Sequence, residues 1–196
     1  MYYQDITLLP TIEVNINFIW NKIYTPIHKG FVNIEEKAGA NLIGTAFPFY
    51  DEKNKRCGLG HKLRLFAKDE KTLSALGVVH LLKNYSDYVF ISEIEKVPME
   101  IVTSYSHFRR YRPKKIRSNY SLAKHWAKKK NTTIESELER MKDRKQEITK
   151  LPYLFLQSST NGNRYKIFVS REVVKSHSPG CFSTFGLSQD STVPNF

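Results

Sequence analysis

The first hundred residues alternate between two hydrophobic periods, and this alternation limits the chain to few folds. Stretches in which apolar residues recur at every second position, as Leu63 and Leu65 do between Lys62 and Arg64, are typical of strands. In residues 12–31, by contrast, isoleucines recur every three or four positions, which is typical of a helix. We expect strands over residues 2–9, 42–49, 62–66 and 88–94, and helices over residues 12–31 and 73–82.

The resulting order, βαββαβ, is that of the ferredoxin-like fold, which many RNA-binding modules share. Turn-forming residues between 51 and 60 suit the hairpin that this order requires. Pro26 should kink or perturb the first helix, because proline lacks the backbone N–H that a helix interior uses. We therefore predict a ferredoxin-like domain over residues 1–97, although such a fold does not by itself define a function.

Residues 98–196 differ in character and predict a second, smaller α+β domain. A basic loop leads into a basic helix over residues 121–130, and a further helix is expected over residues 133–148. Thr132 and Glu135 have the spacing of a capping box at the start of that helix. Three more strands are expected over residues 153–157, 164–170 and 182–187.

Positive charge is concentrated in one segment of the chain. The net charge is +12, and residues 101–134 hold ten lysines and arginines and no acidic residue, which leaves only about +2 for the rest. Solvated faces usually mix charge signs because like charges repel, so we interpret this segment as the binding surface for a polyanion such as a nucleic acid. The candidate residues for contacting this polyanion are Arg109, Arg110, Arg112, Lys114, Lys115, Arg117, Ser121, Lys124, Lys128 and Asn131.

Within this set, helical spacing places Arg117, Ser121, Lys124, Lys128 and Asn131 along one stripe of the basic helix. Lysine offers point charges for phosphates, whereas the planar fork of arginine can also grip a base edge in two places. The arginines are therefore the better candidates for reading bases.

The remaining composition indicates which chemistry to expect. Cys57 and Cys181 form no spaced cysteine motif, the six histidines are scattered, and no Gly-rich phosphate loop is present, so we expect no metal and no cofactor. No run reaches the roughly 18 apolar residues of a membrane span, and the N-terminus lacks the pattern of a signal peptide. We expect a cytoplasmic protein with no membrane partner. Metal-free cleavage of RNA remains possible, because the 2′-hydroxyl beside the scissile phosphate can itself be the nucleophile.

Several segments carry a resemblance to a known family: IHKGFV, IGTAFPFYDE, LGHKLRLFA, LPYLFLQSSTNGNRYKIFV and FSTFGLSQDSTVPNF. Together they resemble the CRISPR-associated precursor-RNA endoribonucleases of type I-F systems, nearly end to end and most strongly after Leu151. The resemblance implies a ferredoxin-like N-terminal half and a basic helix that enters the groove of a repeat RNA hairpin. It also implies a cut at the base of the stem, and an enzyme that stays on its product beside other subunits of a surveillance complex.

The resemblance also implies roles for individual residues. His28 in IHKGFV matches the family's catalytic histidine, and Ser158 in LQSSTNG matches the serine that holds the nucleophilic 2′-hydroxyl. An imidazole with a pKa near 6.5 can accept that proton at neutral pH. Tyr165 in NRYKIFV falls where the family places an aromatic ring that stacks on a base beside the cut.

One position departs from the family pattern. The family usually has a tyrosine in the C-terminal motif whose hydroxyl helps to orient the histidine, and this chain has Phe185 there. If residues 182–187 form a strand, Ser183 lies on the same face as Phe185 and its hydroxyl could replace the missing one. The alternative to an enzyme is a non-catalytic subunit that binds an RNA hairpin. A DNA-binding regulator is less favoured, because the basic helix lacks a helix-turn-helix partner.

Overall fold

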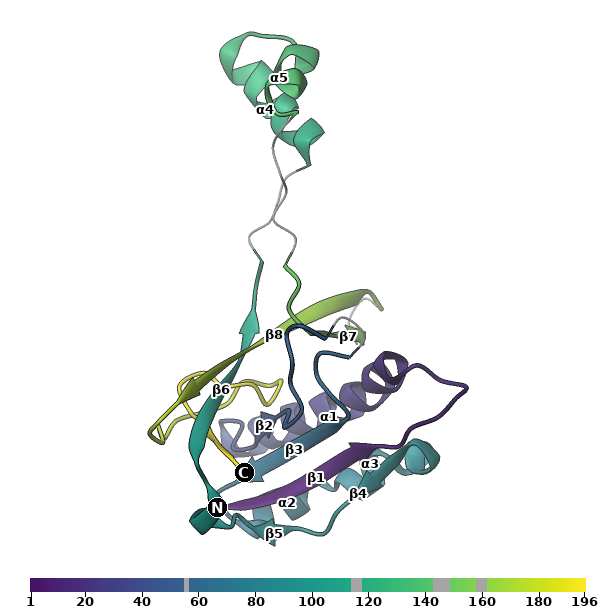
Figure 1. The fold of residues 1–196 in the computed structure, drawn as a ribbon, viewed down its shortest axis with the longest axis vertical. Helices are drawn as coiled ribbons and strands as arrows, with labels where there is room; N and C mark the ends of the chain where they lie inside the picture. Colours follow the sequence, from purple (N-terminus) through teal and green to yellow (C-terminus); the bar gives the residue numbers. More distant parts are fainter. Residues whose placement is uncertain (55–56, 114–117, 143–148, 158–161) are drawn as a thin grey trace. The chain divides into compact units, whose positions relative to one another are not determined.

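The computed structural model describes residues 1–54, 57–113, 118–142, 149–157 and 162–196 (Figure 1). These residues form an α+β protein with two sheets. They divide into two compact units, of which the first comprises Met1–Tyr111 with Leu151–Phe196 and the second comprises Arg112–Lys150. Both sheets belong to the first unit. In the part of the chain that is described, no helix is both long enough and apolar enough to cross a lipid bilayer.

The first sheet contains the strands expected in the N-terminal half. Its strand order is β2-β3-β1-β4, and all neighbouring strands are antiparallel. The strands are β1 (Tyr2–Leu8), β2 (Gly44–Ala46), β3 (Lys62–Ala67) and β4 (Val89–Ile91), and β5 (Glu95–Lys96) also pairs with β1. β2 and β4 are shorter than the expected strands over residues 42–49 and 88–94.

Helix α1 (Ile16–Ala38) is the longest element and lies on the same face of this sheet as α2 (Glu70–Leu76) (Figure 1). It starts later than expected because Asn15 caps it, accepting a hydrogen bond from the backbone N–H of Asn17. It continues beyond residue 31 until Gly39, which has the left-handed backbone conformation that ends helices. The helix is unbroken at Pro26, so the expected effect of proline on its course is limited.

The second expected helix is interrupted. Gly77 has a φ of 62°, which ends α2, and the short helix α3 (Val78–Leu81) begins directly after it. A 3₁₀ segment, η1 (Lys83–Tyr88), then leads into β4. The apolar spacing that predicted one continuous helix therefore spans two.

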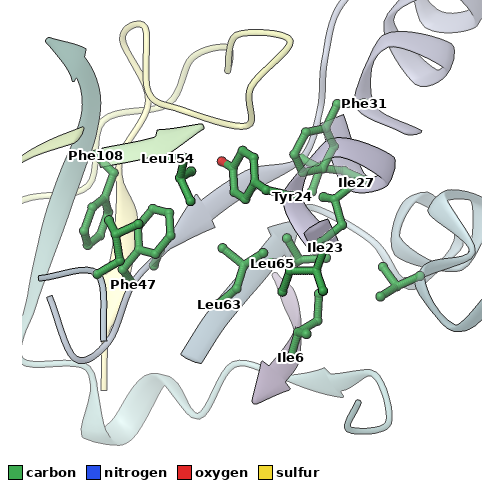
Figure 2. Packing of buried hydrophobic residues seen from close by; sticks show 14 of the residues in the cluster. Ile6, Ile23, Tyr24, Ile27, Phe31, Phe47, Leu63, Leu65, Phe108 and Leu154 are labelled. Atoms are coloured by element: carbon green, nitrogen blue, oxygen red, sulfur yellow. The ribbon is translucent and has the colours of Figure 1, made fainter. Parts of the chain in front are cut away.

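The core of the first unit joins α1 to both sheets (Figure 2). Ile23 and Ile27 of α1 are fully buried, as are Leu63 and Leu65 of β3. Further along, the rings of Phe47 and Phe108 meet edge to face at 5.6 Å and connect the first sheet with the second. Buried residues of α1 and of strands from both sheets thus belong to one hydrophobic cluster, which holds the helix in place.

The second sheet has the order β7-β8-β6-β9, again with antiparallel neighbours. Its strands are β6 (Ser104–Tyr111), β7 (Tyr153–Gln157), β8 (Arg164–Val174) and β9 (Val193–Asn195). Residues 104–111, which were not among the expected strands, form β6, and Ser106, His107 and Phe108 are buried in it. The expected strand over residues 182–187 is wrong: this segment makes only isolated bridges at Phe182 and then turns.

The second unit lies in the chain between β6 and β7. Tyr111, at the end of β6, and Tyr153, at the start of β7, both pair with Phe168 of β8. The chain therefore leaves the second sheet on one side of β8 and returns to it on the other side of the same strand.

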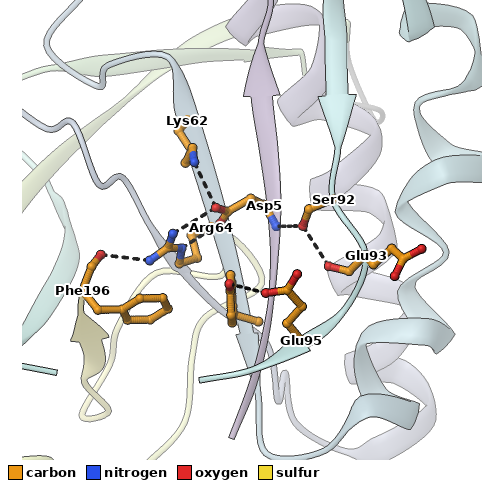
Figure 3. Close-up of polar contacts among 8 residues, drawn as sticks. Asp5, Lys62, Arg64, Ser92, Glu93, Glu95 and Phe196 are labelled. Atoms are coloured by element: carbon orange, nitrogen blue, oxygen red, sulfur yellow. Dashed lines mark hydrogen bonds and ion pairs between the residues drawn. The ribbon is translucent and has the colours of Figure 1, made fainter. Parts of the chain in front are cut away.

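Polar contacts hold the C-terminal residues on the first sheet (Figure 3). Arg64 donates to both carboxylate oxygens of Asp5, at 2.7 and 2.9 Å, and to the carbonyl oxygen of Phe196 at 3.1 Å. Its guanidinium also lies 4.8 Å from the ring centre of Tyr3 and 4.0 Å from that of Phe196. These contacts anchor the last residues of the chain to β1 and β3.

The second unit contains α4 (Asn119–Lys130) and α5 (Ile134–Arg140). Ala123 and Ala127 of α4 are buried, and Asn131 ends the helix with a φ of 54°. The expected helix over residues 133–148 is described only to Arg140, since residues 143–148 lie outside the described residues.

The start of α5 differs from the expected capping box by one residue. Thr133 is the cap and accepts from the N–H of Ser136, while the hydroxyl of Thr132 donates to the buried carboxylate of Glu137. Desolvation alone would raise the pKa of Glu137, but the Thr132 hydrogen bond and the charges of Lys130 and Arg140 outweigh it and hold that pKa below its usual value. Glu137 therefore joins α4 to α5 as a buried anion.

Candidate active site

His28 lies on α1, half-buried, and one of its ring nitrogens is fixed. Nδ1 is 2.7 Å from the backbone carbonyl oxygen of Thr184. Because a carbonyl oxygen only accepts hydrogen bonds, Nδ1 must carry the proton in a neutral ring. Nε2 is then the unprotonated nitrogen, and this is the tautomer that a general base needs.

The turn that presents Thr184 is tied to the same helix. The Tyr24 hydroxyl, one turn before His28 on α1, donates to the carbonyl oxygen of Phe185 at 2.7 Å. Gly186 has a φ of 69°, and a Cβ there would run into Thr45. The turn can therefore lie close against α1 and β2 only with glycine at this position.

Ser183 does not take the role that we expected for it. Its hydroxyl donates to the carbonyl oxygen of Leu187 at 3.1 Å and accepts from the N–H of Phe185 at 3.4 Å. The reason is that the segment turns here, so side chains two residues apart do not share a strand face. Ser183 shapes the turn, and the Nδ1 partner of His28 is a backbone group of its neighbour, Thr184.

Phe185 and Arg110 complete a stack above the imidazole. The rings of His28 and Phe185 are nearly parallel, with centroids 4.5 Å apart and an interplanar angle of 12°. On Phe185 lies the guanidinium of Arg110, which β6 supplies, with Cζ 4.9 Å from the ring centre. The structure thus brings together a candidate base, the residue at the family tyrosine position and one candidate RNA-binding arginine.

The surroundings of His28 favour its neutral form. Burial lowers the pKa of His28, the hydrogen bond to Thr184 raises it, and the positive charge of Arg110 lowers it further. The net result is a pKa below the ordinary 6.5. At pH 7 the imidazole is therefore neutral and ready to accept a proton.

Comparison with known proteins identifies the family. The model of the family described as "CRISPR-associated protein (Cas_Csy4)" matches residues 3–196. The chain belongs to this family. The resemblance inferred from the sequence is thereby confirmed.

Two curated relatives of the Cas_Csy4 family match along their whole length. The "CRISPR-associated endonuclease Cas6/Csy4" of Escherichia coli (strain UTI89 / UPEC) is 27% identical over 197 residues, covering 100% of this chain and 99% of the relative. The protein of the same name from Pseudomonas aeruginosa (strain UCBPP-PA14) is 26% identical over 196 residues, with the same coverage.

The other residues singled out for their chemistry are distributed over the molecule. Ser158 lies outside the described residues, and β7 ends directly before it at Gln157. Tyr165, on β8, is half-buried, packs against the core and pairs in register with Leu156. Among the described residues, no group of three His, Cys, Asp or Glu side chains lies together in a way that could hold a metal.

The basic residues are found in both units. Arg109 of β6 forms a surface ion pair of 2.6 Å with Glu172 on the neighbouring strand. The second unit carries exposed residues along the predicted stripe and just before it: Arg112, Ser121, Lys124, Lys128 and Asn131. Lys114, Lys115 and Arg117 lie outside the described residues.

The sequence did not point to the groups that orient the histidine. Thr184 acts through its backbone, so its side chain gives no signal. Tyr24 could have been noticed, because it lies four residues before His28 and so shares its helix face.

Proposed function

We propose that this protein is a metal-independent endoribonuclease that cuts the hairpin of a CRISPR repeat RNA at the base of its stem. The family and the two relatives named as endonucleases support the reaction class. The observation that carries the proposal is the 2.7 Å contact between His28 Nδ1 and the Thr184 carbonyl oxygen, which leaves Nε2 as the base.

In the proposed reaction, Nε2 of His28 takes the proton of the 2′-hydroxyl next to the scissile phosphate. The 2′-oxygen bonds to phosphorus while the bond from phosphorus to the 5′-oxygen breaks, and a proton from solvent restores the 5′-hydroxyl. The products are a 2′,3′-cyclic phosphate and a 5′-hydroxyl end. General-base catalysis of this kind is typically worth about 10²- to 10⁴-fold in rate. Ser158 holds the 2′-hydroxyl in line with the leaving oxygen, and Tyr165 stacks on a base beside the cut.

Binding of the hairpin is assigned to the basic residues. Lys124 and Lys128 are both exposed on one side of α4, where they can contact phosphates. Arg110 is placed near the chemistry by its stack on Phe185 and can contact RNA next to the cut. The product stays bound as the mature guide RNA, in a cytoplasmic complex with other subunits of a type I-F system.

We further propose that residues 1–97 form a ferredoxin-like domain. The antiparallel order β2-β3-β1-β4, with α1 and α2 on one face, supports this assignment. The division of the chain into this domain and an RNA-hairpin-binding domain over residues 98–196 stays a prediction.

A second candidate is a hairpin-binding subunit without activity. It is favoured by one observation, the absence of a hydroxyl at Phe185, where the family usually has tyrosine. The carbonyl oxygen of Thr184 already holds Nδ1 of His28, so a tyrosine hydroxyl is not needed to orient the ring. We therefore favour the endoribonuclease over the inactive subunit.

One cleavage experiment tests the proposal. The protein is incubated with a repeat hairpin RNA in EDTA, and in parallel with the same hairpin carrying a single 2′-deoxy substitution directly 5′ of the scissile phosphate. We expect cutting of the first and none of the second. Cutting of the deoxy hairpin would make water the nucleophile and overturn the mechanism, whereas binding without cutting of either RNA would support the second candidate.

A further inference from the structure

A cavity of about 500 Å³ lies in the first unit beside α1. One wall is α1, another is formed by β7 and β8, and a third by the segment around α3 and η1. The residues that matter for its chemistry are Phe18, Lys22, Lys29, Phe155 and Arg164.

The cavity borders on the proposed active site. Thr25 and Lys29 both line it, and His28 lies between them in the sequence of α1. Asn21, two helical turns before His28 and so on nearly the same side of α1, also lines it. On the opposite wall the lining includes Gln157, the residue directly before Ser158. The cavity therefore lies along α1 next to His28.

Its lining is positively charged. Lys22, Lys29 and Arg164 are exposed, and within the described part of the chain none of them pairs with a carboxylate. The described lining contains no acidic residue. An anion, such as a phosphate of the RNA backbone, is the ligand that this arrangement favours.

Aromatic rings alternate with these charges. Phe18 is 53% exposed, and Lys22 Nζ lies 5.3 Å from its ring centre. Across the cavity, the guanidinium of Arg164 lies 5.0 Å from the ring centre of Phe155. Aromatic faces beside cations are the combination with which proteins hold single-stranded nucleic acid, because bases stack on the rings while the cations follow the backbone.

We propose that this cavity holds the first one or two unpaired nucleotides on the single-stranded side of the cut, with Phe18 stacking on a base and Lys22, Lys29 and Arg164 contacting phosphates. The inference rests on the proposed function, since it takes the base of the hairpin stem as the place of cutting. The size of the cavity is that of a small-ligand site, which suits a nucleotide or two but not a duplex. The site secures the strand that leaves the stem and so sets the direction of the scissile bond.

Binding of two uncleavable hairpins tests this proposal. Both carry the 2′-deoxy substitution at the cut; one ends at the scissile phosphate, and the other continues for six unpaired nucleotides. We expect the wild type to bind the longer RNA about tenfold more tightly, as one stacked base with its phosphate contact would give. The double variant Phe18→Ala with Lys22→Ala should bind both RNAs alike, with the affinity of the wild type for the shorter one.

A matched control changes the same residue types elsewhere in the first unit. Phe90 is 60% exposed, Lys68 is exposed, and neither lines the cavity. The double variant Phe90→Ala with Lys68→Ala should keep the tenfold gain. The proposal is overturned if the wild type shows no gain, if the Phe18 and Lys22 variant keeps it, or if that variant loses affinity for both hairpins equally.

The same RNAs with a ribose at the cut separate this inference from the proposed function. Cutting with no gain from the unpaired nucleotides would remove the cavity proposal and leave the enzyme intact. A gain that depends on Phe18 and Lys22, without any cutting, would keep the single-strand site and remove the catalytic assignment.

Discussion

Replacing Phe185 should reveal how the imidazole of His28 is held in place. Two contacts fix the ring: the hydrogen bond from Nδ1 to the Thr184 carbonyl oxygen at 2.7 Å, and the parallel stack on Phe185 at 4.5 Å. The first involves a backbone group and survives any change of the Phe185 side chain. Phe185→Leu therefore removes the stack alone, while Phe185→Tyr keeps the stack and adds the hydroxyl that the family usually has.

The magnitudes follow from these contacts. An aromatic pair is worth about 0.5 to 1.5 kcal/mol beyond its burial, so Phe185→Leu should slow cutting by about two- to tenfold if all of that energy orients the base. For Phe185→Tyr, Nδ1 already has a partner, so the rate should change by less than about tenfold, or roughly 1.4 kcal/mol.

Single-turnover cleavage at saturating protein measures these effects, and thermal unfolding checks that each variant is folded. Phe49→Leu is a matched control, because Phe49 stacks on His61 at 4.2 Å and 20° outside the candidate site, and its loss should leave the rate unchanged. A thousandfold loss in Phe185→Leu would show that the ring does more than pack. An inert wild type that Phe185→Tyr activates would refute the assignment of Thr184 as a sufficient partner.

We expect His28→Ala to abolish cutting while hairpin affinity, measured by filter binding, stays within a few-fold, because the base acts on chemistry and not on docking; a variant that cuts at the wild-type rate would exclude His28. Since burial and Arg110 hold the pKa of His28 below 6.5, the single-turnover rate should stay at its plateau at pH 7 and fall as the base becomes protonated only below pH 6.5. A rate that is already half-maximal above pH 6.5 would contradict this. Changing Lys124 and Lys128 together to alanine should weaken hairpin binding and reduce its salt dependence by about 0.7 to 0.9 in log K against log salt for each lost phosphate contact; an unchanged slope would assign the two lysines to solvent alone.

The N-terminal helices and strands were predictable because the spacing of their apolar residues reflects which side chains are buried in the core around the first sheet. Residues 62–66 alternate as a strand must, and the isoleucines of α1 face the core as their spacing requires. Gly77 divided the second helix because a single left-handed residue outweighs an apolar period that continues across it. β6 was missed because Arg109 and Arg110 near its C-terminal end, and two polar residues among the three buried ones at its centre, conceal the apolar pattern of a strand.

The candidate site was predictable only where side chains carry it. His28 and Phe185 were found through the family resemblance, and the structure places them in contact. The partner of Nδ1 is a carbonyl in a turn, and a turn of this kind looks like a strand when Ser183 and Phe185 are simply counted along the chain. The role of a backbone carbonyl cannot be inferred from the side chain of its residue and is found only in the folded structure.

The position of the second unit in the chain has a consequence for how such proteins can diversify. Tyr111 and Tyr153 flank Phe168 on β8, so the two ends of the inserted segment stand about 10 Å apart, the width of two strand spacings. About four residues would bridge that gap. A segment inserted between such close ends can be lengthened, shortened or exchanged for that of a relative without changing the register of either sheet. Relatives in this family can thus differ in residues 112–150 while keeping α1 and the turn around Thr184 unchanged.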